Sequence, residues 1–387
     1  MFSIVIGLWL ALGFLCFGIP LIIYILMIRA SSRPWPTRID EDYQPKVSIL
    51  IPAYNESGTI SFKLQNLLRV RYPRDKMEIV VVDNGSTDDT VRQAEEFAES
   101  NRDRSIKVTV QAEQKGKSAA LNFGLRHCTG EVVIVSDADC FWAEDILEKS
   151  LPFLADDQVG AISGPTLLMN PKATWVTRSE EDYMASHNRV KLGESKSGST
   201  LVFGGGFSAF KRKAIQGFDP YRTGSDDSGT VIRIVENRLK ALLVPDARYF
   251  TVFSLAWKDK LSVKIRRASQ FQRVFSRYAL LCLKRKITTS RRIVLQDLLL
   301  YLIGPVAFAL FVLMSIWAVF LLPYLALCFL VFLIPRARFY FAELVQGYAV
   351  LLLAMVMAMG GKRILRWNPP NDRNLLTKEV LERYRLI

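Results

Sequence analysis

The stretch Glu131–Cys140 reads Glu-Val-Val-Ile-Val-Ser-Asp-Ala-Asp-Cys and indicates how the chain around it folds. Its β-branched apolar residues, Val132 to Val135, predict a strand that is buried on both faces. Asp137 and Asp139 follow this strand directly. In an open α/β sheet, ligands bind outside the carboxyl ends of the strands, where two carboxylates form a hard oxygen site for Mg²⁺ or Mn²⁺. An isolated Asp-x-Asp is more often a solvated turn than a cation site, so the choice between the two depends on the neighbouring segments.

The neighbouring segments repeat the same pattern of a buried strand that ends in polar residues. Val47–Ile51 leads to Pro52-Ala-Tyr-Asn-Glu56, and Ile79–Val82 leads to Asp83. Ile106–Val110 is a further short strand, and helical segments separate all of them, which predicts an α/β, Rossmann-like domain with a mostly parallel sheet and helices on both faces. A buried Asp at a strand end costs several kcal/mol unless it is paired. These strand ends therefore predict a cleft for a ligand that carries hydrogen-bond donors and phosphate charge.

Apolar segments on both sides of this domain predict membrane helices. Ile4–Ile28 has no charge and, at about 1.5 Å per residue, can span a hydrocarbon core of roughly 30 Å. Arg29 follows it, so we expect an anchor in the cell membrane with the α/β domain in the cytoplasm. A secretory signal peptide fits less well, because there is no basic n-region and no cleavage site.

The number of later crossings stays open in the sequence. Leu298–Pro335 suits two crossings that turn around Pro323, and Leu344–Gly361 is long enough for a third. Three crossings would place the basic tail outside, against the positive-inside tendency. The expected organisation is an anchor at 1–30, an α/β domain at 45–255, basic amphipathic interfacial helices at 256–295, two or three membrane helices at 296–361 and a basic tail at 362–387.

The charge distribution and the cysteine spacing limit which binding partners and which metal or disulfide sites are expected. The 387 residues carry a net charge of +14, and the basic residues cluster between residues 258 and 292, among apolar ones. Such a segment beside a membrane predicts contact with anionic lipid headgroups, and nucleic acid is not an expected partner. The five cysteines show no C-x-x-C spacing, and His127 and His187 have no neighbouring ligands, so no disulfide framework and no zinc site is predicted.

Four motifs, in their order and spacing, resemble the family 2 glycosyltransferases, the inverting enzymes that include cellulose, chitin and hyaluronan synthases and dolichyl-phosphate sugar synthases. They are Ile51-Pro-Ala-Tyr-Asn-Glu56, Val82-Asp-Asn-Gly-Ser-Thr-Asp88, Lys115-Gly-Lys117 with Ala120-Leu-Asn122, and Asp137-Ala-Asp139. The resemblance covers residues 45–280 and the flanking membrane segments fit its synthase-like branch. It implies a GT-A domain, a nucleotide-sugar donor, with UDP favoured over GDP, and Mg²⁺ or Mn²⁺ as cofactor.

The resemblance also implies roles for individual residues. It places the cation on Asp139 and Asp137. It assigns nucleotide-sugar binding to Pro52, Tyr54, Glu56, Asp83, Lys117, Asp137, Gln270 and Arg273. It makes Gly204, Gly205 and Gly206 an acceptor loop, since glycines let a backbone approach a sugar closely. Without the family, Lys117 would be an exposed lysine at a helix start and the glycines a flexible turn.

Asp226 and Asp227 are the candidates for the general base. Paired carboxylates on a glycine-bracketed loop give reach and a neighbour that raises the pKa of the base. The loop is similar to the Thr-Glu-Asp motif of cellulose synthases, which favours Asp227 first and Asp226 second. Either residue could instead cap the helix predicted after it.

Ser269-Gln-Phe-Gln-Arg-Val274 resembles the Q-x-x-R-W motif of processive synthases, with Val274 where tryptophan is expected. We expect this change to remove an aromatic platform for the acceptor sugar and to weaken processivity more than sugar transfer.

The implied function is a membrane-bound inverting transfer of a sugar to a saccharide acceptor, in one displacement that turns an α-linked donor into a β-linked product, with polysaccharide synthesis as one outcome. A lipid-phosphate acceptor such as a polyprenyl phosphate is the first alternative, and a catalytically decayed membrane scaffold is the second. The donor sugar and the oligomeric state do not follow from the sequence.

Overall fold

The computed structural model describes residues 2–387 except 112–115, 288–289, 322, 324–326, 328–329, 332 and 362–373. Its α/β domain is built on a seven-stranded sheet of order β3-β2-β1-β4-β8-β6-β9. The strands are β1 Val47–Ala53, β2 Met77–Asp83, β3 Ser105–Val110, β4 Val132–Val135, β6 Val159–Ser163, β8 Ser208–Lys211 and β9 Lys240–Leu243. The first four are parallel, and only β8 runs antiparallel to its neighbours β4 and β6. The predicted mostly parallel sheet is confirmed.

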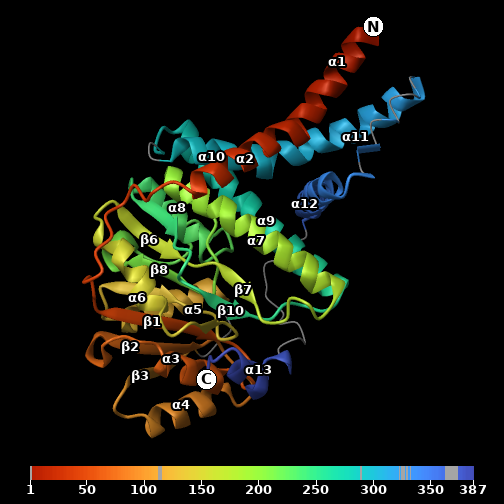
Figure 1. Cartoon of the computed structure of the whole chain (residues 1–387). Coiled ribbons are helices and arrows are strands. Elements are labelled where there is room, and N and C mark those ends of the chain that lie inside the picture. The colour runs from red at the N-terminus through yellow and green to blue at the C-terminus, as the bar shows by residue number, and fades with distance from the viewer. Residues whose placement is uncertain are drawn as a thin grey trace.

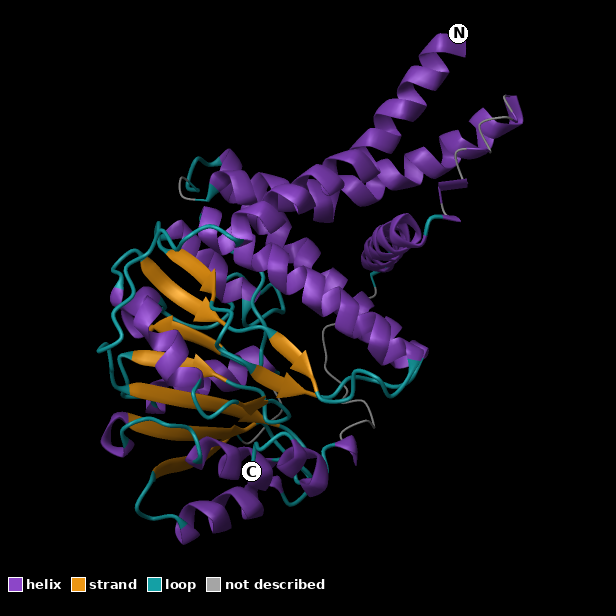
Figure 2. Cartoon of the chain, in the orientation of Figure 1, coloured by secondary structure: helices purple, strands orange, loops and turns teal. Residues whose placement is uncertain are grey.

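Helices cover both faces of this sheet (Figure 2). Because side chains alternate along a strand, Leu50 and Val133 enter one core while Ile49 and Ile134 enter the other. The second of these cores contains side chains of α3 Ile60–Leu68, α4 Thr90–Ser100 and α6 Ile146–Ser150. The first contains side chains of α5 Lys117–Gly124, α8 Ser228–Glu236, α9 Trp257–Leu283 and α2 Ile19–Ser31. The strand Val132–Val135 is buried on both faces, as predicted.

A second, three-stranded sheet stands beyond the carboxyl end of β4. Its order is β5-β10-β7, with β5 Phe141–Trp142, β10 Tyr249–Thr251 and β7 Thr166–Leu168. β5 begins directly after the Asp137–Cys140 turn, so this sheet fixes the far end of the loop that carries the two carboxylates.

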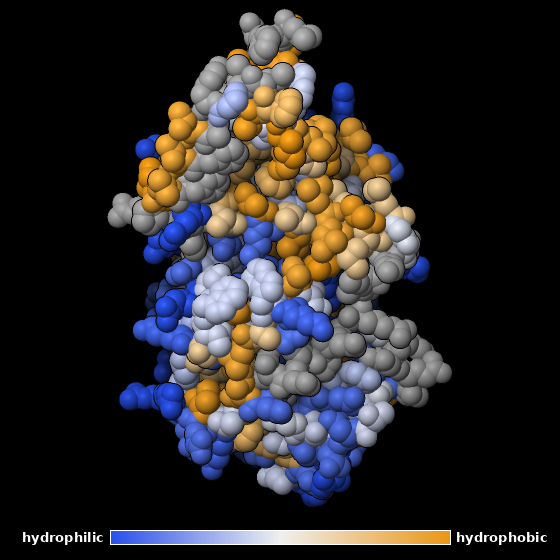
Figure 3. Space-filling model, turned by 90° about the vertical axis from the view of Figure 1, so that its right-hand side faces the viewer, coloured by the Kyte–Doolittle hydropathy of each residue, from blue (hydrophilic) through white to orange (hydrophobic). Residues whose placement is uncertain are grey.

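Three helical segments in the described residues are long and apolar enough to cross a membrane: Ile4–Ser31, Arg291–Phe320 and Tyr340–Met359. The first comprises α1 Phe2–Gly13, a π turn Phe14–Gly18 and α2, and the second comprises α10 Arg291–Leu298, a π turn Leu299–Ile303 and α11 Gly304–Leu321. In Figure 1, α1 and α11 project together from the domain, whereas α2 lies on α7 Trp175–Ser197. Trp9 of α1 stacks on Phe311 and donates to Ser315 Oγ at 2.9 Å. Figure 3 shows apolar side chains over one half of the face that it presents and hydrophilic ones over the other.

The third apolar segment, in α12 Pro335–Met359, runs alongside the basic helix α9. Lys264 Nζ donates to Gln346 Oε1 at 2.8 Å, and further along both helices Gln272 Nε2 donates to the carbonyl of Leu351 at 2.7 Å. A helix with as many charges as α9 stays out of hydrocarbon. The charged helix α9 and the candidate span in α12 are therefore in direct contact.

The chain returns to the α/β domain after α12. Leu381 of α13 Lys378–Arg383 and Leu386 are buried against Phe141 of β5. Asn66 Nδ2 donates to the carbonyl of Leu386 at 2.8 Å. Residues 374–387 therefore pack on the α/β domain, and we expect both to lie on one side of the membrane that the apolar helices would cross. From this we infer an even number of crossings between residues 291 and 374; the basic residues Lys362, Arg363 and Arg366 themselves lie outside the described residues.

Labelling from one side of the membrane tests this topology. In sealed vesicles, Glu379→Cys in α13 and Ser100→Cys in α4, both exposed, should react with an impermeant maleimide in the same vesicle orientation. The unsubstituted protein gives the background from its own cysteines, of which Cys16, Cys128 and Cys140 are buried and Cys282 is half-buried. Labelling of the two sites from opposite sides would contradict the inference.

Candidate active site

Lys117 links two carboxylates in front of the carboxyl end of β4. Its Nζ lies 2.7 Å from Asp137 Oδ1 and 2.9 Å from Asp226 Oδ2. Burial by itself would lower the pKa of Lys117, but the charges of Asp137, Asp226 and Asp227 outweigh it and raise the pKa well above its usual value. Lys117, the first residue of α5, is thus a partly exposed cation that is paired with two carboxylates at the centre of the candidate site.

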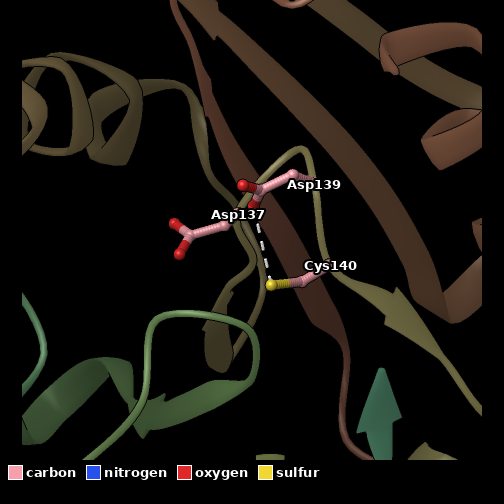
Figure 4. Close-up of side chains that lie close together, drawn as sticks. All are labelled: Asp137, Asp139 and Cys140. Carbon is pink, nitrogen blue, oxygen red and sulfur yellow. Dashed lines mark hydrogen bonds between the residues drawn. The ribbon is translucent and has the colours of Figure 1, made fainter. Parts of the chain in front are cut away.

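Asp137 and Asp139 extend from the turn that follows β4 (Figure 4). Ligand atoms of Asp137, Asp139 and Cys140 all lie within 4.8 Å of one another. Burial, and then the charges of both aspartates, raise the pKa of Cys140, so its thiol stays protonated and donates to Asp139 Oδ1 at 3.6 Å. A hard divalent cation prefers the carboxylates to a thiol. The two aspartates that the sequence predicts therefore have the chemistry and the proximity of a Mg²⁺ or Mn²⁺ site.

Two buried polar residues of α3 hold this turn, and sequence reasoning missed both. Lys63 Nζ donates to the carbonyl of Cys140 at 2.6 Å and lies 4.6 Å from the centroid of the Trp142 ring. Asn66 Nδ2 donates to the carbonyl of Trp142 at 2.9 Å, and the Trp142 amide donates back to Asn66 Oδ1 at 2.8 Å. Burial lowers the pKa of Lys63 to about 7. The available signal was a lysine and an asparagine on the same helical face as the apolar Leu64 and Leu67.

The glycine loop presses against the same turn. The amide of Asp137 donates to the carbonyl of Gly205 at 3.0 Å, and Trp142 Nε1 donates to the carbonyl of Gly206 at 2.7 Å. A Cβ on Gly205 would lie 2.5 Å from Asp137 Oδ2 and 2.9 Å from Lys117 Nζ, and a Cβ on Gly204 would lie 2.2 Å from Tyr249 Oη. The glycines are therefore required by close packing, and the alternative of a plain flexible turn does not account for them.

We predict that Gly205→Ala lowers the sugar transfer that the sequence implies by about a hundredfold while the protein stays folded. The new methyl group meets the ends of two side chains, which can move, but a shift of about 1 Å in a catalytic group costs on the order of a hundredfold in rate. Turnover and melting temperature, measured together, check this. Gly58→Ala, where nothing lies within 4 Å of the added Cβ, is the matched control. Unchanged turnover in Gly205→Ala would contradict the prediction.

The acidic loop divides two tasks between adjacent residues. Asp227 caps α8, since its Oδ1 accepts from the Ser228 amide at 2.6 Å and from Ser225 Oγ at 2.5 Å. Asp226 faces Lys117 instead. Burial raises the pKa of Asp226 to about 6, Lys117 opposes this, and Asp227 and Asp137 add to it. Asp227 therefore performs the capping that the sequence left open. Asp226 contacts Lys117, which in turn contacts Asp137 in the turn after β4.

The ends of β1 and β2 form a polar platform beside this cluster. The buried Asp83 accepts from the amides of Gly85 and Ser86 at 3.0 and 3.1 Å. Asn55, at a left-handed φ of 53°, accepts from the Thr87 amide at 2.8 Å and ties the two strand ends together. These hydrogen bonds fix the positions of the polar residues at the ends of β1 and β2.

The other residues assigned to the donor occupy three places. Pro52 and Tyr54 lie at the end of β1 and just after it, and Glu56 is buried and accepts from Thr59 Oγ1 at 2.8 Å. Gln270 Nε2 of α9 donates to the carbonyl of Gly224 at 2.5 Å, which ties α9 to the acidic loop. Arg273 lines a groove beside that loop. Lys115 lies outside the described residues.

Val274 does not face the site. Its side chain is fully buried in the core that includes Val231 and Ile232 of α8. The buried valine offers no surface to an acceptor sugar, and the weaker processivity expected from the missing tryptophan stays a prediction.

Comparisons with known proteins agree with this geometry. Residues 48–218 match the family model for glycosyl transferase family 2. The chain is 30% identical to the solved structure of "Mannosyltransferase PcManGT from Pyrobaculum calidifontis in complex with GDP-Man and Mn2+", with a TM-score of 0.77 over 92% of this chain and 99% of that one. A probable glycosyltransferase of Bacillus subtilis, YdaM, is 36% identical over 35% of this chain and 32% of its own length. A poly-beta-1,6-N-acetyl-D-glucosamine synthase of Staphylococcus aureus is 29% identical over 49% of this chain and 44% of its own length.

The chain spans less than half the length of these two curated relatives, whereas the mannosyltransferase structure matches almost end to end. The fold and the site define a nucleotide-sugar transferase domain. The chain belongs to glycosyl transferase family 2, and the predicted family, fold class and enzyme class are confirmed.

Proposed function

We propose that this chain is an inverting, metal-dependent glycosyltransferase of the membrane surface that transfers a hexose from a nucleotide-diphosphate sugar. The observation that carries the proposal is the bridge from Asp137 through Lys117 to Asp226. In the proposal, Asp137 would hold the cation, Lys117 would face phosphate and Asp226 would be one of the two candidate bases, and their contacts support this assignment. We assign the catalytic domain to the cytoplasmic side, because basic residues follow the first apolar helix and fill α9.

The chain's own residues divide the reaction as follows. Asp137 and Asp139 would hold Mn²⁺ or Mg²⁺, which when bound neutralises charge on the departing diphosphate. Lys117 supplies a second positive charge beside that position. Asp227, or Asp226 as the second candidate, accepts the proton of the acceptor hydroxyl as it attacks the anomeric carbon. The glycine loop brings its backbone close to the reacting sugar.

For the donor, the near end-to-end similarity to a mannosyltransferase solved with GDP-Man supports a GDP-sugar, GDP-mannose first. The sequence alone favoured UDP, and the S. aureus synthase, which matches only about half of this chain, is the relative that supports a saccharide polymer as product. The acceptor is therefore a saccharide or a lipid-linked group.

The test uses the full chain purified in detergent, with GDP-mannose, UDP-glucose and UDP-N-acetylglucosamine in turn, with Mn²⁺ or Mg²⁺ and then with EDTA. We expect metal-dependent release of GDP from GDP-mannose. Release from a UDP-sugar alone would overturn the nucleotide preference. If no donor is bound and no nucleotide is released from any of them, the proposed enzymatic function is wrong and the scaffold alternative is supported.

A further inference from the structure

A groove of about 550 Å³ lies outside the acidic loop, between the segment before that loop, α9 and the end of α12. The residues that matter here are three arginines, one aromatic and two apolar side chains, namely Arg222, Arg273, Arg277, Tyr221, Leu280 and Ala358. None of the described residues that line it is acidic. The groove therefore carries a local charge of three arginines next to an apolar edge.

Two of the arginines are positioned by their neighbours: Arg277 by Tyr221, which also lines the groove, and Arg222 by a backbone turn. Tyr221 donates through its hydroxyl to Glu236, and the guanidinium of Arg277 lies 4.0 Å from the centroid of the Tyr221 ring. Arg277 Nε is buried, and within the described part of the chain it has no hydrogen-bond partner. Arg222 has a left-handed φ of 54°, in a turn closed by its amide and the carbonyl of Asp219 at 3.0 Å. The Tyr221 ring thus holds the Arg277 guanidinium at the wall of the groove.

The groove leads from the acidic loop toward the membrane surface. Gln270, which contacts the acidic loop at Gly224, and Arg277 are seven residues apart on α9, or about 10 Å along its axis. Ala358 closes the other wall near the end of α12. The neighbouring residues Val356 and Met359 are 61% and 85% exposed. An apolar helix surface therefore borders the basic groove.

We propose that this groove binds the phosphate-bearing headgroup of a lipid and presents a lipid-linked acceptor to the acidic loop. Guanidinium groups bind phosphate in paired hydrogen bonds, and the apolar edge at Leu280 and Ala358 accommodates a hydrocarbon chain. The donor's own phosphates belong at Asp137 and Asp139, so this is a second phosphate site. The acceptor role rests on the proposed function, whereas lipid binding does not. Bulk anionic phospholipid has the same headgroup chemistry, and the experiment separates the two sources.

The experiment uses the full chain in phosphatidylcholine nanodiscs, to which a polyprenyl phosphate or phosphatidylglycerol is added, with bound lipid measured by native mass spectrometry. The Arg222→Gln, Arg277→Gln double variant should bind polyprenyl phosphate about tenfold more weakly. The matched control is Arg291→Gln, Arg292→Gln, which removes two exposed charges of the same basic region outside the groove. Metal-dependent hydrolysis of the donor should be unchanged in both variants.

Equal losses in the groove variant and the control, or no loss in the groove variant, would overturn the proposal. A loss for phosphatidylglycerol as large as for polyprenyl phosphate would overturn the acceptor role and leave a phospholipid site. Normal lipid binding in a protein that hydrolyses no donor would sink the proposed function but not the groove.

Discussion

Asp139→Asn should abolish metal-dependent release of the nucleotide, with a loss on the order of a thousandfold. The change keeps the shape of the side chain but removes one of two charges that would hold the cation. Asp139 lies within 4.8 Å of the other ligand atoms, and its carboxylate accepts from the Cys140 thiol, a contact that the amide oxygen can keep. The fold should therefore survive.

Donor hydrolysis at increasing Mn²⁺ measures the effect, because a weakened site is partly rescued by excess cation whereas an unfolded one is not. Asp157→Asn is the control, since Asp157 is almost fully exposed and away from this turn. Activity of Asp139→Asn close to that of the unsubstituted protein, with or without EDTA, would remove Asp139 from the metal site.

The second large effect is expected in the acidic loop, where Asp227→Asn should lower transfer by about a hundredfold to ten-thousandfold, the range for loss of a general base. Asparagine is as good a helix cap as aspartate, so α8 should keep its start at Ser228. Asp226→Asn should instead release Lys117 from one of its two partners and raise the KM for the donor.

The pH profile separates the two acids. Because the pKa of Asp226 is about 6, its carboxylate is lost as the pH falls through 6, and with it the ion pair to Lys117. The unsubstituted protein should show this acidic decline in donor binding. In Asp227→Asn the decline should move to lower pH, because the charge of Asp227 helps to raise the pKa of Asp226, and in Asp226→Asn it should be absent. If Asp226→Asn loses transfer while Asp227→Asn retains it, the base is Asp226 and our first choice is wrong.

The local parts of this architecture were predictable from sequence, because they depend on local pattern. Runs of β-branched residues with polar ends predict β1, β2 and β4. The position of Asp137 and Asp139 directly after β4 predicts that they belong to the site. The sequence order of the motifs then predicts the family.

The parts that could not be predicted depend on contacts between distant segments. The local sequence does not indicate that Lys63 and Asn66 support the turn that carries Asp137 and Asp139. It also does not indicate that Asn66 contacts the carbonyl of Leu386. Likewise a motif comparison places Val274 beside an acceptor, whereas the packing of α9 on α8 buries it. Periodicity indicates which face of a helix is apolar but not which neighbour covers it.

The return of residues 374–387 to β5 has a consequence for biogenesis. A nascent chain folds from its N-terminal end as the ribosome extends it, yet Asn66 and Phe141 receive their last partners only after the apolar segments 291–320 and 340–359 have been made. The support of the turn that carries Asp137 and Asp139 is therefore completed late, once the following helices have been delivered to the lipid. We therefore expect maturation of the candidate catalytic centre to follow synthesis of the apolar segments.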